Sequence, residues 1–181
     1  MKNPLSISQV FDMKYETKAQ LAETALLALS VVFETLSGNC GEMKMEIAGW
    51  EEGRTFAMGI LPDGPAVTLR KEKGKIKYLG KGIRNPELAI YFKNMDSALL
   101  VFLGQMGAHT AAIQRRTIIH GNLGKAVETV RAMAVVQKYL FPDFIVNATF
   151  KRKPTFTFSQ KMLKAQLYAT LAPSLILNSN K

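Results

Sequence analysis

The chain has 181 residues, of which 48% are hydrophobic and 21% charged, and its formal net charge is +10. This composition is typical of a globular protein, and the length favours one domain over residues 1–181. The single cysteine, Cys40, excludes an intramolecular disulfide and a cluster of thiolate zinc ligands, which fits a reducing compartment.

The N-terminal part of the chain is predicted to form a leader followed by a helix. Residues 1–16 have little periodicity and lack the apolar core of a secretory signal. A helix is predicted over residues 17–36, with one apolar stripe of Leu21, Ala25, Ala28, Leu29, Val32 and Leu36. The longest apolar run, Ala25–Phe33, is far shorter than the roughly 20 residues that a membrane-spanning helix needs. We therefore expect no membrane span and a cytoplasmic location.

Period-two alternation predicts a group of strands in the next segment. Met43–Ala48 alternates as a half-buried strand does, and Arg54–Ile60 is predicted to return beside it. Pro62–Pro65 has the composition of a turn. A hairpin is expected from Ala66–Lys71 and Lys75–Leu79, with Val67, Leu69, Ile76 and Tyr78 facing inward.

The segment from residue 86 to 140 is apolar and contains few carboxylates. It is predicted to hold a strand (Leu88–Phe92), a helix from a cap at Asp96 to Gly104, a short helix or turn at 107–113, a strand at 116–120, and a helix capped by Asn122 that runs to Leu140. The face of that last helix is expected to comprise Leu123, Ala126, Val127, Val130, Ala134 and Gln137. The fold class is therefore α+β (α/β), with a mostly antiparallel sheet of five or six strands.

The C-terminal extension, residues 141–181, differs in pattern from the rest. Residues 141–146 are predicted to be an aromatic connection, residues 150–154 a basic one, and residues 155–158 a short extended piece. Ser159 is expected to cap a final helix that ends before Pro173.

Residues 43–140 resemble the sterol carrier protein type 2 family. The shared pieces are a strand, a helix of pattern D-x-x-L-L-x-x-L-x-G (Asp96–Gly104), a short A-x-x-Q helix (Ala111–Gln114), a second strand, and G-N-L-G before an amphipathic helix (Gly121–Gly124). The chain departs from the family at Arg115, where the family has a glycine that favours positive φ. We therefore expect this turn to be remodelled.

The resemblance implies a standalone lipid-carrier domain, with helices over one face of the sheet and an apolar tunnel between the two. The residues that would line this cavity are Leu99, Phe102, Leu103, Met106, Ile113, Val127, Val130, Met133, Met162, Leu163 and Leu167. In the family the C-terminal helix commonly closes the cavity, so residues 159–172 are either a lid or a plain core helix.

The sequence offers no positive argument for an enzyme. The two histidines, His109 and His120, stand in no metal-binding spacing, and Cys40 lies in a glycine turn with little to stabilise a thiolate. Gly121–Lys125 is too short for a nucleotide-binding loop, and Ala126 replaces the hydroxyl that would bind the metal. Its helix N-terminus could still attract a carboxylate or phosphate headgroup. We predict no catalytic residue, no metal and no cofactor.

Basic residues are concentrated after residue 53, at positions 70–84, at Arg115–Arg116 and at 151–153. They could form a solvated face or a contact with anionic membrane, whereas no nucleic-acid-binding motif is present. The predicted function is non-catalytic binding of a fatty acyl chain, a sterol-like molecule or an isoprenoid lipid, and the sequence leaves open whether the lipid is transferred or only held. The alternatives are a basic module that binds nucleic acid or an acidic protein, and an accessory domain of a lipid-modifying enzyme. The sequence leaves the oligomeric state open.

Overall fold

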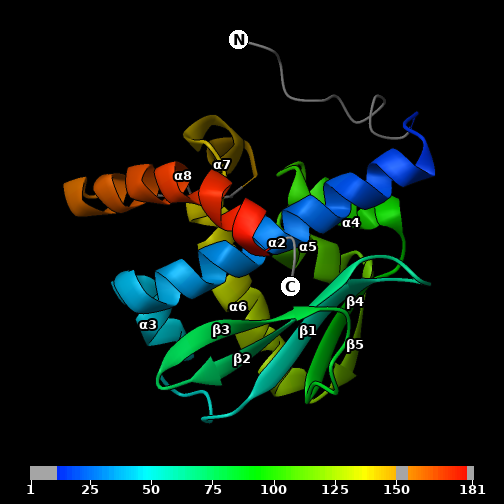
Figure 1. Cartoon of the computed structure of the whole chain (residues 1–181), viewed down its shortest axis with the longest axis horizontal. Helices are drawn as coiled ribbons and strands as arrows, with labels where there is room; N and C mark the ends of the chain where they lie inside the picture. Colours follow the sequence, from blue (N-terminus) through cyan, green and yellow to red (C-terminus); the bar gives the residue numbers. More distant parts are fainter. Residues whose placement is uncertain (1–11, 150–154, 179–181) are drawn as a thin grey trace.

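The computed structural model describes residues 12–149 and 155–178, so most of the predicted leader and the basic connection at 150–154 lie outside the described residues. Its strands form one five-stranded sheet, which lies on one side of the helices (Figure 1). The strands are β1 (Thr55–Ile60), β2 (Ala66–Glu72), β3 (Lys75–Lys81), β4 (Leu88–Phe92) and β5 (Thr117–Gly121). The strands predicted at 54–60, 66–71, 75–79, 88–92 and 116–120 are thereby confirmed within one or two residues at most ends.

The sheet has the strand order β3-β2-β1-β4-β5. Three neighbouring pairs are antiparallel, and the central β1–β4 pair is parallel, with Phe56 opposite Leu88. An irregularity between Thr68 and Leu69 shifts the β2–β3 register. The prediction of a mostly antiparallel α+β sheet is confirmed.

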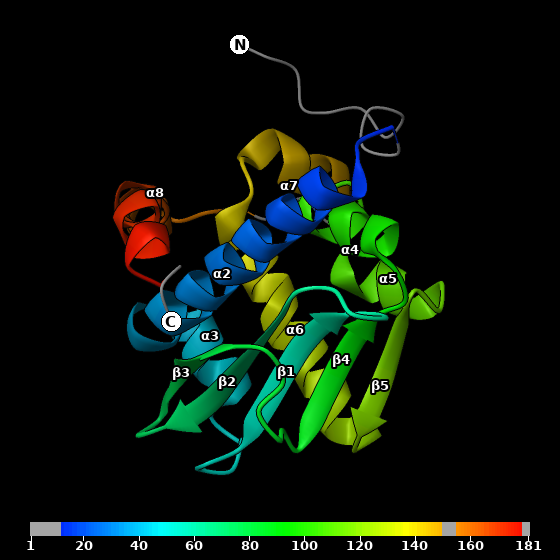
Figure 2. The same cartoon turned by 45° about the vertical axis from the view of Figure 1, so that its right-hand side comes forward.

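Helices cover one face of this sheet (Figure 2). They are α2 (Tyr15–Asn39), α3 (Gly41–Ile47), α4 (Met95–Phe102), α5 (Ala108–Ile113), α6 (Leu123–Leu140), α7 (Asp143–Thr149) and α8 (Phe158–Asn178). Helices α2 and α6 pack next to the sheet, and α8 packs on α2 and α6 rather than on a strand. The molecule therefore has the order sheet, inner helices, α8.

Helix α2 is a core helix. By length and composition it is the one helix of the described residues that could cross a membrane, yet 56% of its apolar window is buried in the fold. Its Phe33 contacts Phe56 of β1 edge to face, with ring centroids 5.6 Å apart. Trp50 packs against the same ring at 5.6 Å. The inward residues predicted for the β2–β3 hairpin, Val67, Leu69, Ile76 and Tyr78, are all buried.

The opposite face of the sheet is crossed by the connection between β3 and β4, residues 82–87 (Figure 2). The Thr68 hydroxyl donates to the Gly82 carbonyl over 2.8 Å and accepts from the Arg84 N–H over 3.1 Å. The Thr55 hydroxyl accepts from the Glu87 N–H over 3.1 Å. Threonines on β2 and β1 thus hold the crossover against the face that carries no helices.

The strand predicted at Met43–Ala48 is wrong, because this segment forms helix α3. Met43 and Ile47 are both buried, whereas Met45 is 75% exposed. Residues four apart lie on the same face of a helix, and residues two apart lie on the same face of a strand. Met43 and Ile47 are four apart, so this short segment fits the pattern of a helix as well as that of a strand. The sheet accordingly has five strands and not six.

Two other predicted helix details are corrected. The cap of α4 is Asn94, whose side chain accepts from the Ser97 N–H over 2.8 Å, and Asp96 instead pairs with Lys18 over 2.8 Å. The cap of α6 is Asn122, as predicted, but Leu123 and Val127 are more than half exposed. The buried face of α6 consists of Ala126, Thr129, Ala132, Met133, Val135, Val136, Gln137 and Tyr139.

The turn before β5 keeps the backbone conformation that a glycine would favour. Arg115 has φ +54°, within the left-handed region. The prediction of a remodelled turn is therefore wrong, because the φ angle of Arg115 is positive, as it would be for a glycine at this position. Arginine meets a steric penalty at this φ that glycine would not.

The C-terminal extension is more helical than predicted. Helix α7 occupies part of the expected aromatic connection. Helix α8 begins at Phe158, where Thr157 and Gln160 form a reciprocal capping box: the Thr157 N–H donates to Gln160 Oε1 over 2.9 Å, and the Gln160 N–H donates to Thr157 Oγ1 over 3.4 Å. The predicted cap at Ser159 and the predicted end before Pro173 are both wrong, since α8 continues to Asn178.

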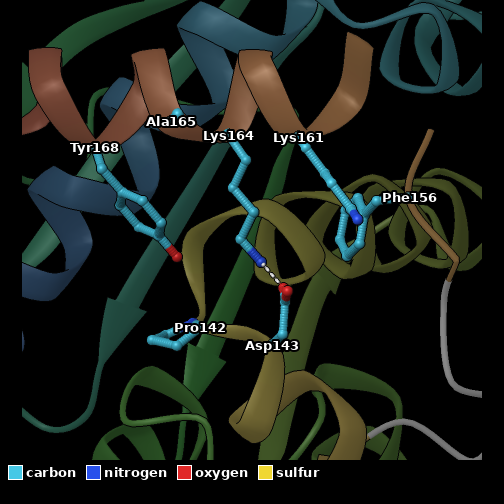
Figure 3. A pocket seen from close by; sticks show the side chains of 7 residues that line it. All are labelled: Pro142, Asp143, Phe156, Lys161, Lys164, Ala165 and Tyr168. Atoms are coloured by element: carbon cyan, nitrogen blue, oxygen red, sulfur yellow. Dashed lines mark hydrogen bonds and ion pairs between the residues drawn. The ribbon is translucent and has the colours of Figure 1, made fainter. Parts of the chain in front are cut away.

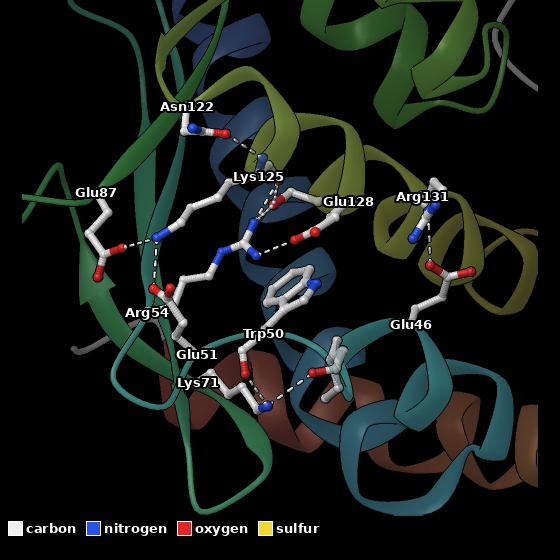
Figure 4. Close-up of polar contacts among 12 residues, drawn as sticks. Glu46, Trp50, Glu51, Arg54, Lys71, Glu87, Asn122, Lys125, Glu128 and Arg131 are labelled. Carbon is white, nitrogen blue, oxygen red and sulfur yellow. Dashed lines mark hydrogen bonds and ion pairs between the residues drawn. The ribbon is translucent and has the colours of Figure 1, made fainter.

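Two buried cations join the helices to the sheet (Figure 4). Arg54 donates to Glu128 over 2.5 Å and to the Lys125 carbonyl over 2.6 Å. The Lys71 ammonium donates to the carbonyls of Ile47 and Trp50 over 3.0 and 2.6 Å. Lys71 therefore does not belong to a solvated basic face, although the sequence places it among exposed lysines.

Candidate functional site

A groove runs between helix α8 and the start of helix α7 (Figure 3). It encloses about 350 Å³ and is open to solvent. Its lining residues are Pro142, Asp143, Phe156, Lys161, Lys164, Ala165 and Tyr168. This volume lies at the lower end of the range of small-molecule sites in proteins. We call it the α7–α8 groove.

The α8 wall of the groove follows from helical spacing. Lys161, Lys164, Ala165 and Tyr168 are separated by three, one and three residues, so they project from one side of the helix towards Pro142 and Asp143. The adjacent side of α8 carries Leu167, which is buried against the inner helices. One helix thus anchors itself with one face and lines the groove with another.

Lys164 is a desolvated cation at the floor of the groove. Its side chain is only 9% exposed. The ammonium pairs with Asp143 over 2.7 Å and donates to the Lys138 carbonyl over 3.2 Å. It also lies 4.7 Å from the centroid of the Phe156 ring. Two of its three protons therefore have partners within the protein, and the third remains for another acceptor.

Phe156 forms the aromatic end of the groove. Its ring contacts Tyr139 edge to face at 5.7 Å. The ammonium of Lys138 lies 5.2 Å from the same ring centroid and pairs with Glu42 over 2.8 Å. Cation–π contacts with two lysines orient the Phe156 side chain at the beginning of α8.

A second cleft, of about 300 Å³, continues from the first. It is lined by Asp143, Val146, Asn147, Thr155, Phe156 and Lys161. Because Asp143, Phe156 and Lys161 line both clefts, the two are parts of one depression along α7. The ammonium of Lys161 has no ion-pair or hydrogen-bond partner among the residues that the structure describes.

Tyr168 closes the far end of the groove, and its hydroxyl donates to the Leu140 carbonyl over 3.0 Å. Burial, and secondarily the negative charge of Asp143, raises the pKa of Tyr168 to about 12. The folded state therefore holds this proton more tightly than the unfolded chain does, since a tyrosine there has a pKa of about 10. Its contribution to stability is complete below about pH 10 and is lost as the pH rises towards 12.

We expect an alkaline titration followed by tyrosinate absorbance to show one late step that Tyr168→Phe removes. The difference between wild-type and variant titration curves should have its midpoint at a pH of about 12. The same titration of Tyr15→Phe, which changes a tyrosine that is 60% exposed, is the control. A difference curve for Tyr168 with an unshifted midpoint, near 10, would contradict the rise in its pKa that we assign to partial burial and to Asp143.

The predicted lining residues fall into three groups. Leu99, Phe102, Met133 and Leu167 are buried in the core. Leu103, Met106, Val130 and Leu163 are partly buried and pack against it. Ile113, Val127 and Met162 are exposed, by 81, 53 and 50%. The first two groups belong to, or pack against, one core cluster, and the three exposed residues lie outside it. The role of all these residues in ligand binding stays a prediction.

Two further clefts also open at the surface. One, of about 260 Å³, lies beside Cys40, Tyr139 and Leu163, and the Cys40 thiol donates to the Tyr139 hydroxyl over 3.4 Å. The other, of about 410 Å³, lies at the start of α2 beside Tyr15 and the Glu23–Lys81 ion pair. Of the predicted lining residues, these four clefts include Leu163 alone. The tunnel between sheet and helices stays a prediction.

Comparison with known proteins shows a likeness of fold. Sterol carrier protein 2 aligns with 61% of this chain and 91% of its own, at 16% identity and a TM-score of 0.48. A conserved hypothetical protein from Thermus thermophilus aligns with 70% of this chain and 90% of its own, at 15% identity and a TM-score of 0.47. Sterol carrier protein 2 from Yarrowia lipolytica, in its apo form, aligns with 60% of this chain and 88% of its own, at 11% identity and a TM-score of 0.41.

The chain is similar in fold to sterol carrier protein 2 domains. No protein-family model matches the sequence, and no curated protein matches it. At this level of identity the likeness concerns the arrangement of the chain. The ligand is therefore inferred below from the chain's own side chains.

The described residues contain no group of three or more His, Cys, Asp or Glu side chains placed to hold a metal ion. What the α7–α8 groove offers instead is apolar wall from Pro142, Phe156 and Ala165, beside two ammonium groups. This combination suits the non-covalent binding of an amphiphile.

Proposed function

We propose that the protein binds a single-chain amphiphile, with an apolar chain and an anionic head, in the α7–α8 groove. The observation that carries this proposal is the position of Lys161 and Lys164 beside the apolar wall of Phe156 and Ala165. Of the lipid classes that the sequence leaves open, a fatty acyl chain with a free carboxylate fits this pairing best. A sterol-like molecule has no charge for the two lysines.

The expected binding energy comes mainly from the chain. Each methylene removed from water contributes about 0.8 kcal/mol, which is about fourfold in affinity. Lys161 is expected to pair with the head, because its ammonium is exposed and has no partner among the described residues. The Lys164 ammonium donates two of its protons to Asp143 and to the Lys138 carbonyl. Its third proton supplies a second contact with the head of the ligand.

Helix α8 is the element we expect to move when the ligand enters. Within residues 158–171 only Lys164 and Leu167 are buried, whereas most of the side chains of α6 are buried or half-buried. A helix with few buried contacts opens at a lower free energy than the core does. The displacement of α8 would lengthen the groove towards the inner helices, as a lid does, and would allow the ligand to be transferred.

The test is displacement of a fluorescent fatty acid, cis-parinaric acid, by saturated fatty acids of increasing length. We expect affinity to rise with length, and Lys161→Glu and Ala165→Phe each to weaken it about tenfold or more, through charge reversal and through filling of the groove. Lys44→Glu makes the same charge change on the exposed face of α3 and should leave affinity unchanged.

Hydrogen exchange supplies a second readout. The amides of α8 should exchange faster than those of α6 in the free protein and should slow when the fatty acid binds. The proposal is wrong if both groove variants bind as the wild type does, or if Lys44→Glu weakens binding as much as Lys161→Glu. Cholesterol that competes as well as a fatty acid would overturn the preference for an anionic head.

A further inference from the structure

A second feature, unrelated to the groove, lies on the sheet face that carries no helices. Arg70 of β2 stands directly opposite Lys77 of β3 in the antiparallel register. The chain neighbours of Arg70, Leu69 and Lys71, point to the helices, so Arg70 and its cross-strand partner Lys77 point away from the helices. Both Arg70 and Lys77 are exposed. Arg84 comes to the same surface from the crossover connection.

Arg84 is held flat against the sheet. Its Nε donates to the Lys81 carbonyl over 3.4 Å. A Cβ at Gly80 would collide with the Arg84 guanidinium, so the absence of a side chain at Gly80 makes room for it. We call Arg70, Lys77 and Arg84, with the exposed Lys73 of the adjoining turn, the basic sheet face.

This arrangement of charges does not serve folding. Like charges directly opposite each other on a sheet destabilise it. None of the four side chains of the basic sheet face forms an ion pair with a carboxylate of the described residues. Elsewhere the chain pairs its lysines and arginines readily, as Lys125 does with Glu51 and Glu87. An external anionic surface is what would offset the repulsion.

We propose that the basic sheet face docks on a phospholipid bilayer that contains anionic headgroups. A β-sheet face is broad and presents its cations side by side, as a planar array of headgroups requires. Ile83, next to Arg84, is 41% exposed and can enter the apolar edge of the headgroup layer. Single-stranded nucleic acid is bound by cationic grooves with aromatic platforms. Between residues 70 and 84 the one aromatic side chain, Tyr78, is buried on the helix side.

This docking is independent of the proposed ligand. Helix α8 is separated from the sheet by α2 and α6, so the α7–α8 groove and the basic sheet face lie on opposite sides of the molecule (Figure 2). A protein docked through the sheet would therefore turn its groove towards the water. The docking proposal therefore does not depend on what the groove binds.

The test is sedimentation with phosphatidylcholine vesicles, with and without phosphatidylserine, at low and high salt. We expect binding only to vesicles with phosphatidylserine, weakening as salt is raised. The double variant Arg70→Gln/Lys77→Gln should lower the partition coefficient about thirtyfold, since each basic residue near such a surface contributes about fivefold. The control, Lys44→Gln/Lys93→Gln, removes two exposed charges elsewhere and should bind as the wild type does.

Urea unfolding tests whether the variant remains folded, and we expect its midpoint to rise because the Arg70–Lys77 repulsion is gone. Unchanged vesicle binding by the Arg70→Gln/Lys77→Gln variant would overturn the proposal. So would binding of single-stranded RNA through these residues by a protein that ignores the vesicles. Displacement of cis-parinaric acid should be normal in this variant, so failure of docking is distinguishable from failure of the groove.

Discussion

Replacing Arg54 with alanine is expected to lower the free energy of unfolding by about 3 kcal/mol. The side chain is 2% exposed, its guanidinium lies 4.1 Å from the Trp50 ring centroid, and it also donates to Thr129 over 3.0 Å. Alanine leaves the Lys125 carbonyl and the Thr129 hydroxyl without this donor and opens a void beside Trp50. Because Glu128 is 40% exposed, water can hydrate its carboxylate when Arg54 is removed. We therefore expect a loss of stability at the lower end of the range that is typical when one partner of a buried ion pair is removed.

Arg131→Ala is the matched control, measured with Arg54→Ala by urea unfolding. Arg131 of α6 also pairs with a glutamate, Glu46 of α3, over 3.1 Å, but its side chain is 55% exposed (Figure 4). Exposed pairs of this kind contribute less than about 1 kcal/mol. Equal losses for the two variants would show that the burial of Arg54 has no energetic weight.

Gly121→Ala should have a comparable effect, about 3 kcal/mol or more, through the backbone. Gly121 has φ +117°, a conformation that residues with a side chain rarely adopt. A Cβ at this position would collide with the carbonyl oxygen of Glu87, and a backbone atom cannot move without displacing β4. The expected result is a lower urea midpoint together with loosened pairing of β4 and β5.

The control variant Gly74→Ala separates the effect of the positive φ angle from the effect of the collision with the Glu87 carbonyl oxygen. Gly74 has φ +71° and no atom within 4 Å of an added Cβ, so alanine there meets the backbone strain alone. We expect a loss of about 1 kcal/mol for Gly74→Ala in the same unfolding experiment. If Gly121→Ala costs no more than this, the contact with the Glu87 carbonyl is not a constraint on the fold.

The strands were predictable because each has a clear local pattern. Alternation identifies β2 and β3, and turn residues bound them. Helix α3 was not predictable, since Met43, Met45 and Ile47 fit an alternating strand and Met43 and Ile47 fit a helix face equally well. The face of α6 was misplaced for a related reason: Leu123 and Val127 are apolar, and hydrophobicity alone does not say which apolar residues a neighbouring element will cover.

The groove was missed because its walls come from separate segments. The spacing of Lys161, Ala165 and Tyr168 could have placed these three on one helix face, but the sequence places neither Asp143 nor Phe156 opposite them. The buried residues Leu99, Phe102 and Met133 were selected for being apolar at helical spacing, which describes a packed core as well as a lined cavity. The burial of Lys71 and Arg54 was equally hidden, since nothing local distinguishes them from exposed basic residues.

The central pairing of β1 with β4 has a consequence for the order in which the chain folds. Strands β1, β2 and β3 are joined by short turns and can assemble early. The parallel β1–β4 seam joins Phe56 to Leu88, and the β4–β5 pair joins Leu88 to Gly121, so each brings together residues about 30 positions apart and neither has a hairpin to start it. We therefore expect β4 and β5 to join the sheet after the three-stranded unit of β1, β2 and β3 has formed.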